Sequence, residues 1–382
     1  MTPADLTAEL KRSARELGFV LTGACPAVAP GGITHLAEWL AAGHAGQMRY
    51  LGDRLAAYAH PQSILEGVRS LLMLGLPYQA GEPASAGAGE GRVSRYAWGS
   101  ADYHDVIHRQ LRKLEQRVRQ LQPSVRVRGV VDTAPLLERE FGQRAGLGWI
   151  GKNTMLLNRH AGSWFFLAAL LLDCVLDYDA PWTTDHCGTC RACLDACPTA
   201  AFPQPYVLDA TRCISYLTIE LRQAVEPQLR PAMGQWVFGC DICQEVCPWN
   251  RRVSGDSEWF APRPDLNPLS LVPLFALDDD AFRAQFRHTP LWRARRQGLL
   301  RSAAIALGNH PVPEALPALR QGLHDADVLV RTASAWALGR FPLADVSADL
   351  TQRLAVESNP DVREEIRQAL AGRNGKRSEN DG

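Results

Sequence analysis

The first part of the chain alternates between helix-like and strand-like hydrophobic patterns. Residues 1–19 place apolar side chains on one face of an amphipathic helix. A second helix is predicted over 104–121, where the apolar residues recur at helical spacing. Short apolar runs predict buried strands over 70–77, 126–131 and 162–176. This mixture predicts an α/β fold for residues 1–180.

The pattern changes after residue 180, and four further segments are expected. They are a cysteine- and proline-rich segment with little periodicity, a connector, a helical-repeat segment and a disordered tail: 181–255, 256–290, 291–372 and 373–382. The first of these has too little apolar periodicity for a large core, so bound metal is expected to hold it together. The chain is therefore predicted to be a multidomain protein, α/β followed by α.

The repeat segment is defined by one short sequence that returns every 31–32 residues or so. Ile305-Ala-Leu-Gly308, Trp336-Ala-Leu-Gly339 and Gln368-Ala-Leu-Ala-Gly372 carry it. Each copy follows a turn-like charged stretch and an arginine: Arg301, Arg331 and Arg363. Stacked helical pairs close to HEAT repeats have this pattern.

Charge and targeting signals narrow the function classes. The formal net charge is zero, so any contact with a nucleic acid must come from a local patch. The N-terminus has no signal-peptide pattern. The most hydrophobic stretch, 164–172, is far shorter than the ~20 residues that span a bilayer. We therefore expect a soluble, cytoplasmic protein without a membrane partner. Ten cysteines in such a chain indicate metal or redox chemistry rather than disulfides.

Eight of the ten cysteines form the pattern of a bacterial two-cluster ferredoxin. The run C-x2-C-x2-C-x3-C-P spans 187–198, and C-x2-C-x3-C-P spans 240–248. In such runs the fourth cysteine ligates the other cluster. One [4Fe–4S] cluster is then predicted on Cys187, Cys190, Cys193 and Cys247. The second run has Val237 where its first cysteine belongs, so the other cluster is predicted on Cys197, Cys213, Cys240 and Cys243.

Zinc is the main alternative for these cysteines, because four-cysteine zinc sites also use C-x2-C pairs. Zinc sites usually separate two such pairs, whereas here three cysteines stand at x2 intervals before Cys-Pro. The spacing favours clusters. The remaining two, Cys25 and Cys174, lie in apolar stretches and are interpreted as buried structural cysteines.

Since clusters move electrons, the chemistry is expected in the α/β segment. Asp132 follows the strand predicted over 126–131, at the place where open α/β sheets bind ligands. It is a candidate general acid or base, and a helix N-cap before Pro135 is the competing interpretation. The glycine-rich stretch 146–153 fits either a phosphate-binding loop or a plain turn. The aromatic and polar residues of 94–104 are pocket candidates or structural.

An arginine-rich stretch leads into the repeats. Residues 282–301 hold six arginines and Trp292 but no acid, which fits contact with a phosphate backbone or a solvated basic face. The candidate nucleic-acid contacts are Arg293, Arg295, Arg296 and Arg301.

Together these features resemble one family, the epoxyqueuosine reductases. The resemblance covers nearly the whole chain. It is carried by RYAWGSADYHDV, VVDTAP, GLGWIGKNTMLLN, CGTCRACLDACPT, RCISYLTIE, GCDICQEVCPWN and the HEAT-like repeats.

The resemblance implies an enzyme that reduces epoxyqueuosine to queuosine at the wobble position of tRNA. Two [4Fe–4S] clusters pass electrons to cobalamin in the N-terminal segment, and the repeats help to hold the tRNA. Asp132 falls on the family's proton donor. The positions implied for cobalamin contact are Asp132, Tyr58, Ser94, Tyr103, His104, Lys152, Asn153, Thr154 and Ser163. Tyr58 stands where the family usually has an arginine.

The expected partners are a tRNA that carries epoxyqueuosine and an external low-potential electron donor, and the chain is expected to be a monomer. The alternative is a corrinoid or flavin iron–sulfur reductase of a small molecule, in which the repeats bind another protein. A pure electron carrier with an adaptor domain leaves the α/β segment without a role.

Overall fold

The structure is a computed structural model that describes residues 1–79, 81–251, 253 and 259–372. The tail predicted over 373–382 lies outside the described residues. Two compact units interleave along the chain. Unit 1 comprises 1–81, 101–211 and 241–261, and unit 2 comprises 82–100, 212–240 and 262–382. Each unit is made of three separate stretches of the chain. The segment boundaries predicted from the sequence therefore stay a prediction.

Unit 1 is built on a four-stranded sheet of order β1-β2-β7-β4. Its strands are β1 (Leu21–Pro26), β2 (Ser70–Pro77), β7 (Phe165–Leu172) and β4 (Val127–Val131). All three pairings are antiparallel, with Leu72 opposite Leu170 and Val130 opposite Ala169. The two central strands are buried almost throughout, which explains why their sequences are continuous apolar runs.

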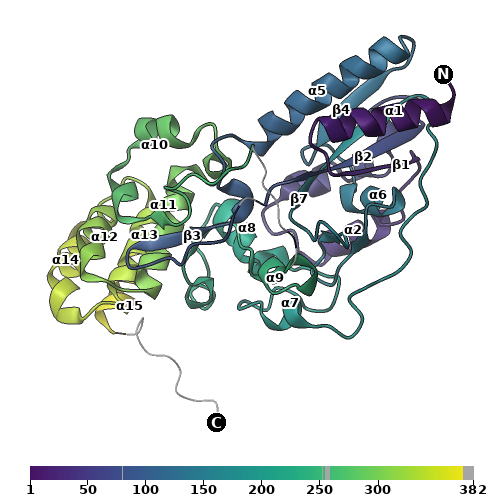
Figure 1. The fold of residues 1–382 in the computed structure, drawn as a ribbon. Coiled ribbons are helices and arrows are strands. Elements are labelled where there is room, and N and C mark those ends of the chain that lie inside the picture. The colour runs from purple at the N-terminus through teal and green to yellow at the C-terminus, as the bar shows by residue number, and fades with distance from the viewer. Residues whose placement is uncertain (80, 252, 254–258, 373–382) are drawn as a thin grey trace. The chain divides into compact units, whose positions relative to one another are not determined.

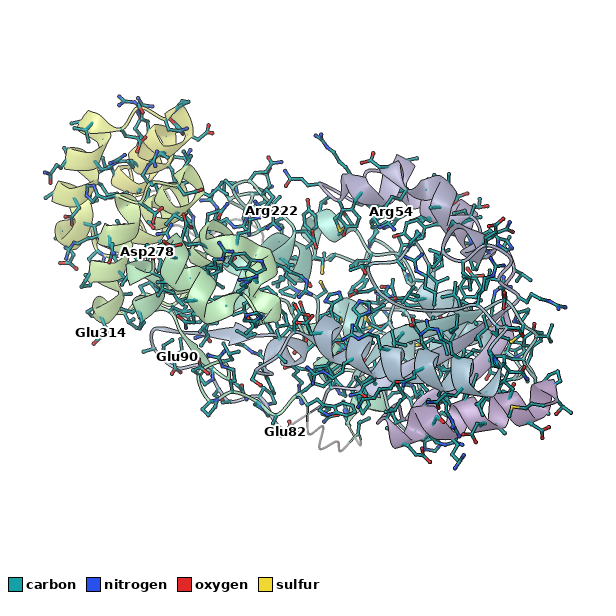
Figure 2. All side chains as sticks on the ribbon, turned by 90° about the horizontal axis from the view of Figure 1, so that it is seen from above. Arg54, Glu82, Glu90, Arg222, Asp278 and Glu314 are labelled. Carbon is teal, nitrogen blue, oxygen red and sulfur yellow. The ribbon has the colours of Figure 1, made fainter. Side chains whose placement is uncertain are left out.

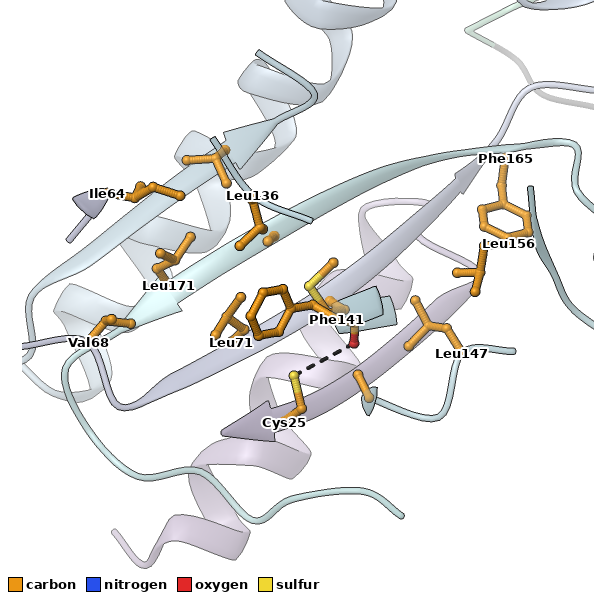
Figure 3. Packing of buried hydrophobic residues seen from close by; sticks show 14 residues of the cluster. Cys25, Ile64, Val68, Leu71, Leu136, Phe141, Leu147, Leu156, Phe165 and Leu171 are labelled. Atoms are coloured by element: carbon orange, nitrogen blue, oxygen red, sulfur yellow. Dashed lines mark hydrogen bonds between the residues drawn. The ribbon is translucent and has the colours of Figure 1, made fainter. Parts of the chain in front are cut away.

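Helices cover both faces of this sheet (Figure 1). On one face lie α1 (Pro3–Glu16) and α5 (Tyr103–Leu121). Helix α5 packs closely on β4, because a Cβ added at Gly129 would come within 2.8 Å of Leu111. The other face packs against α6 (Glu138–Arg144). Figure 3 shows Phe141 of that helix among the buried side chains of the strands. Strand alternation assigns each residue to one of these two cores.

Cys25 belongs to the second core and is fully buried (Figure 3). Its thiol donates to the carbonyl of Phe141 at 3.7 Å, and burial raises the pKa of the Cys25 thiol to about 12. Cys174 is half-buried. The predicted burial of Cys25 is confirmed, its structural role stays a prediction, and Cys174 is more exposed than predicted.

The remaining elements of unit 1 are short. They are α2 (Ile33–Ala41), α3 (Arg49–Asp53), α4 (Leu55–Tyr58), the hairpin of β5 (Trp149–Ile150) and β6 (Leu156–Leu157), α7 (Ala192–Asp195) and α9 (Ile242–Glu245). The two cysteine runs supply α7 and α9, which pack against each other. These runs therefore meet in space although about 50 residues separate them.

Unit 2 joins a small sheet to the helical repeats. The sheet has the order β8-β3-β9, from Trp236–Phe238, Glu90–Val93 and Leu269–Ser270, and α8 (Ile214–Ile219) packs on β8. The helices that follow are α10 (Asp279–Phe286), α11 (Arg295–Asn309), α12 (Leu316–Leu323), α13 (Val328–Leu338), α14 (Leu343–Val356) and α15 (Pro360–Leu370). The inner helices α11, α13 and α15 stack in sequence (Figure 1), as the repeat predicts.

The predicted fold class is confirmed, with one difference in topology. The sheet of unit 1 is antiparallel, so the rule for ligand sites in parallel sheets does not place Asp132. Within the described residues, no helix is at once long and apolar enough to cross a membrane.

Candidate active site and iron–sulfur cavity

Asp132 follows β4 in a turn whose backbone is closed by a hydrogen bond from Ala134 N to Val131 O. The competing interpretation as an N-cap is not what the structure shows. The next helix, α6, begins at Glu138, and no side chain caps it. Asp132 is 38% exposed at its side chain, so it is accessible as well as hydrogen-bonded.

Two side chains from the start of α5 hold the Asp132 carboxyl. The Tyr103 hydroxyl donates to Oδ2, and Nε2 of His104 lies 2.5 Å from Oδ1. Nδ1 of the same imidazole lies 2.9 Å from Oδ1 of Asp102, which is the N-cap of α5. Tyr103 stacks on Phe166 of β7 with ring centroids 4.2 Å apart. A capped helix end and a buried aromatic stack thus fix the geometry around Asp132.

The surroundings of Asp132 include another carboxyl and an arginine. Burial and the charge of Asp132 raise the pKa of Glu138 to about 7. Arg54 donates to the carbonyl of Thr133 at 3.1 Å and so ties down the turn. Tyr58, one of the positions implied for cobalamin contact, is buried, and burial raises the pKa of its phenol. Arg54, one helical turn before Tyr58, thus supplies a positive charge at this turn.

A second group of predicted residues surrounds a cavity of about 230 Å³ in unit 1. The cysteines that line it are Cys187, Cys190, Cys193 and Cys247. Cys197, although closer in sequence to the first three, does not line it. This is the interleaved grouping that the ferredoxin pattern requires.

The size of the cavity bears on the choice of metal. Four cysteines around a space of this volume suit a [4Fe–4S] cluster. Trp249, Pro248 and Leu157 form apolar walls. A low-dielectric wall favours cluster forms of low net charge and tunes the potential.

The cysteines predicted for the second cluster divide between the two units. Cys197 and Cys243 belong to unit 1, and Cys213 and Cys240 belong to unit 2. Their grouping stays a prediction. The sulfur of Cys197 accepts a hydrogen bond from the backbone N–H of Ala201 at 3.3 Å.

The glycine-rich stretch 146–153 is explained by packing. A Cβ on Gly148 would lie 1.9 Å from the carbonyl oxygen of Leu157 across the β5–β6 hairpin. Gly146 has φ +75° and would meet the Ala180 carbonyl at 2.7 Å. The open choice between a phosphate loop and a turn therefore resolves toward a tight hairpin.

Three predicted cobalamin contacts, Lys152, Asn153 and Thr154, lie between the two strands of this hairpin. The Lys152 ammonium donates to the carbonyls of Gly188 (2.5 Å) and Cys190 (2.9 Å), and Lys152 lines the cysteine cavity. Asn153 is buried, and its amide donates to Cys243 O at 3.4 Å. Thr154 is left-handed with φ 65°.

Ser163 is buried, and its hydroxyl accepts from Gln244 at 2.9 Å and from Asn250 at 3.0 Å. Ser94, the remaining predicted contact, belongs to unit 2, where it is buried at the end of β3. The structure thus brings Tyr103, His104 and Asp132 together in one hydrogen-bonded group. Among the described hydrogen bonds, none joins the other predicted cobalamin contacts to these three residues.

The prediction that Arg301 contacts a nucleic acid is wrong for this structure. Arg301 is 1% exposed, and its guanidinium donates to the carbonyls of Leu217, Leu221 and Gln223. Burial lowers its pKa to about 10, which leaves it charged at neutral pH. The position of Arg301 in the repeat is the sequence signal for this structural role, because the equivalent Arg331 and Arg363 also donate to backbone carbonyls. Arg301 is a structural residue.

The other three candidate arginines differ in their contacts and in their exposure to solvent. Arg296 is tied to Asp325 (2.5 Å) and to Leu277 O (2.6 Å), so it is mainly structural. Arg293 and Arg295 line a cavity of about 620 Å³ in unit 2, together with Trp292. Arg295 is exposed, and Trp292 is 40% exposed and stacks on Phe282.

Arg222, labelled in Figure 2, follows α8 and lies beside the start of α11, where it donates to the carbonyl of Ala294 at 3.4 Å. Its guanidinium donates to the carbonyl of Arg293 at 2.8 Å, and it lines the same cavity. Sequence reasoning missed Arg222 because it lies about 70 residues from the arginine-rich stretch. It also missed the roles of Arg54 and Glu138 beside Asp132, which no local motif marks.

Comparison with known proteins tests these expectations. Three family models match: a 4Fe-4S double cluster binding domain over 186–250, epoxyqueuosine reductase QueG over 59–133 and HEAT repeats over 292–371. The epoxyqueuosine reductase of Pseudomonas aeruginosa is 43% identical over 348 residues, which is 88% of this chain and 95% of that protein. The Escherichia coli enzyme is 37% identical over 341 residues, or 88% of this chain and 89% of the relative.

Solved structures similar to this chain are also epoxyqueuosine reductases. A crystal structure of epoxyqueuosine reductase with a tRNA-Tyr epoxyqueuosine-modified tRNA stem loop has a TM-score of 0.90 and 28% identity, and the match covers 97% of this chain and 99% of that one. A Bacillus subtilis epoxyqueuosine reductase also gives a TM-score of 0.90 at 27% identity.

The cysteine cavity and the double-cluster match define an iron–sulfur oxidoreductase with a helical-repeat appendage. More specifically, the chain belongs to the epoxyqueuosine reductase family. The predicted family is confirmed.

Proposed function

We propose that this protein reduces the epoxide of epoxyqueuosine in tRNA to the alkene of queuosine, with Asp132 as the proton donor. The observation that carries the proposal is the Asp132 carboxyl, held between Tyr103 and His104 yet open on one side, in a chain of this family. Low-potential electrons come from an external donor.

The residues of the cysteine cavity fit a [4Fe–4S] cluster, and Cys187, Cys190, Cys193 and Cys247 would hold it. Family membership supports cobalamin near Asp132. When bound, the clusters supply single electrons and cobalamin supplies the reduced metal centre that acts on the substrate ring.

The protein's own contribution is to bind the tRNA and to hold a proton at the reacting oxygen. Tyr103 and His104 fix the carboxyl of Asp132, which a proton donor needs because a misplaced acid transfers its proton slowly. The departing oxygen carries developing negative charge, and Asp132 neutralises it by proton transfer.

For tRNA, the proposed contacts are Arg293 and Arg295, with Trp292 as a surface on which a base stacks. The cavity that they line also contains the acids Glu220, Asp279 and Asp280, so the proposed phosphate contact depends on the arginines alone. The cytoplasmic location and the monomeric state stay predictions.

The test is the conversion of epoxyqueuosine in tRNA, followed by mass spectrometry of the nucleosides. Asp132→Asn keeps the size of the side chain but carries no acidic proton, and we expect turnover to fall by about 10²–10⁴-fold. Iron and cobalamin content are the controls. Near-normal turnover with full cofactor content contradicts the proton-donor role.

The alternative, a small-molecule reductase with a protein-binding repeat domain, predicts no affinity for tRNA. Binding of tRNA that weakens steeply as salt rises excludes it.

A further inference from the structure

The proposed reaction requires more protons than Asp132 holds. Conversion of an epoxide to an alkene breaks two C–O bonds, forms one C–C π bond and releases the oxygen as water. The balance needs two electrons, which the enzyme's reductant supplies, and two protons. A single carboxyl carries one proton at a time, so Asp132 must regain a proton within each turnover.

His104 occupies the place of such a source. Its Nε2 lies 2.5 Å from Oδ1 of Asp132, within hydrogen-bond distance. Its Nδ1 lies 2.9 Å from Oδ1 of Asp102, and the same oxygen accepts the backbone N–H of His104 at 2.9 Å. A carboxylate at Nδ1 holds the proton on that nitrogen and leaves Nε2 to exchange protons with Asp132.

We propose that Asp102 and His104 form a proton relay that recharges Asp132 within each turnover. This inference rests on the proposed function. Asp132 first gives its proton to the epoxide oxygen as the C–O bond breaks. The N–H bond at Nε2 of the imidazolium then breaks and a new O–H bond forms on Asp132. Asp132 gives this second proton to the hydroxyl oxygen, which leaves as water.

After the step, His104 is neutral, Asp132 is ionised and the relay refills from solvent. The His104 side chain is 14% exposed and that of Asp102 is 18% exposed, so water reaches this edge of the group. His104 acts through Asp132, with which its Nε2 is in contact, and is therefore a positioning residue.

Carboxyls face His104 from its own helix, from the turn after β4 and from α6. Asp102 is on its own helix, and Asp132 faces it from the turn after β4. From α6, Glu138 interacts electrostatically with both His104 and Asp132. Tyr103, on the same helix, stacks on the imidazole at 4.2 Å between ring centroids and donates its hydroxyl to the other oxygen of Asp132. Three carboxyls thus surround one imidazole.

A purely structural role would also place His104 against Asp132, so the test must separate proton supply from positioning. The experiment uses the holoenzyme, loaded with iron and cobalamin and reduced beforehand, in single turnovers on epoxyqueuosine tRNA. The variants are His104→Ala, His104→Gln and the control His108→Gln, which changes a histidine one turn later on α5. Iron content, cobalamin content and tRNA affinity are measured for each.

We expect His104→Ala and His104→Gln to lower the rate by about 10²-fold or more with unchanged tRNA affinity. His108→Gln should keep the wild-type rate. Added imidazole should restore the His104→Ala rate, and the restored rate should rise as the pH falls and more of the imidazole is protonated. His104→Gln can donate a hydrogen bond but not a proton, so it should stay slow.

Two results overturn the relay. One is a wild-type rate in His104→Gln, which shows that a hydrogen-bond donor is enough. The other is a His104→Ala rate that imidazole does not raise at any pH while the tRNA still binds. Asp132→Asn separates this failure from failure of the proposed function. If Asp132→Asn is inactive and the His104 variants are normal, only the relay is wrong. If Asp132→Asn is active, the proton-donor role is wrong as well.

Discussion

Replacement of Arg301 by methionine should lower the stability of unit 2 without changing the salt dependence of tRNA binding. The substitution keeps much of the side-chain volume but removes the guanidinium that donates to three carbonyl oxygens of the segment 217–223. Arg301 is 1% exposed, so water cannot replace these donors without opening the packing between α8 and α11.

The magnitude follows from the three bonds. A buried acceptor left without its donor costs about 1–3 kcal/mol, and removing the desolvated cation returns part of this, so we expect a net loss of about 3 kcal/mol. For a unit of this size, 1 kcal/mol corresponds to about 2–4 °C, so the unfolding midpoint of unit 2 should fall by about 6–12 °C.

The matched control is Arg295→Met, the same substitution at an exposed arginine at the start of the same helix. It should leave the midpoint almost unchanged and reduce the slope of log affinity for tRNA against log salt by about 1. Calorimetry and a salt titration measure the two effects. A reduced salt slope in Arg301→Met, or a large drop in midpoint in Arg295→Met, would refute the assignment of the two roles.

The other predictions concern the acid beside Asp132 and the cysteines. Because the folded pKa of Glu138 is raised to about 7, its contribution to stability is present at acidic pH and is lost as the pH rises through 7. Glu138→Gln should therefore gain about 2 kcal/mol over the wild type between pH 5 and pH 8 in urea unfolding, and equal pH profiles would contradict this. Cys247→Ser should lose about half of the iron by metal analysis, since it removes one ligand of the cavity cluster. Cys25→Ala should keep all of it, and iron loss there would contradict a purely structural Cys25.

The sequence predicted elements wherever a local pattern determines them. The strand over 70–77 was predicted at the bounds that β2 has, because a fully buried strand is a continuous apolar run. The helix over 104–121 lacks only Tyr103 of α5. The stretch 162–176 forms one strand, β7, because the loops at its ends are apolar and look strand-like in sequence.

Side-chain partners were less accessible to sequence reasoning. Asp132 was singled out by its place after a strand, a rule for parallel sheets that does not apply to this antiparallel one. What holds Asp132 is the start of α5, about 30 residues earlier, and no local pattern shows that contact. Arg301 shows the converse, because composition suggested a phosphate contact while the repeat register indicated a structural role.

The most direct test of the account is a defined turnover. Purified holoenzyme with both clusters and cobalamin is mixed with a low-potential reductant and tRNA that carries epoxyqueuosine, and the nucleosides are then analysed by mass spectrometry. We predict a product lighter by one oxygen atom that coelutes with queuosine, with two electrons consumed for each product formed. Unchanged epoxyqueuosine in the presence of fully loaded, reduced protein and bound tRNA would contradict the central claim.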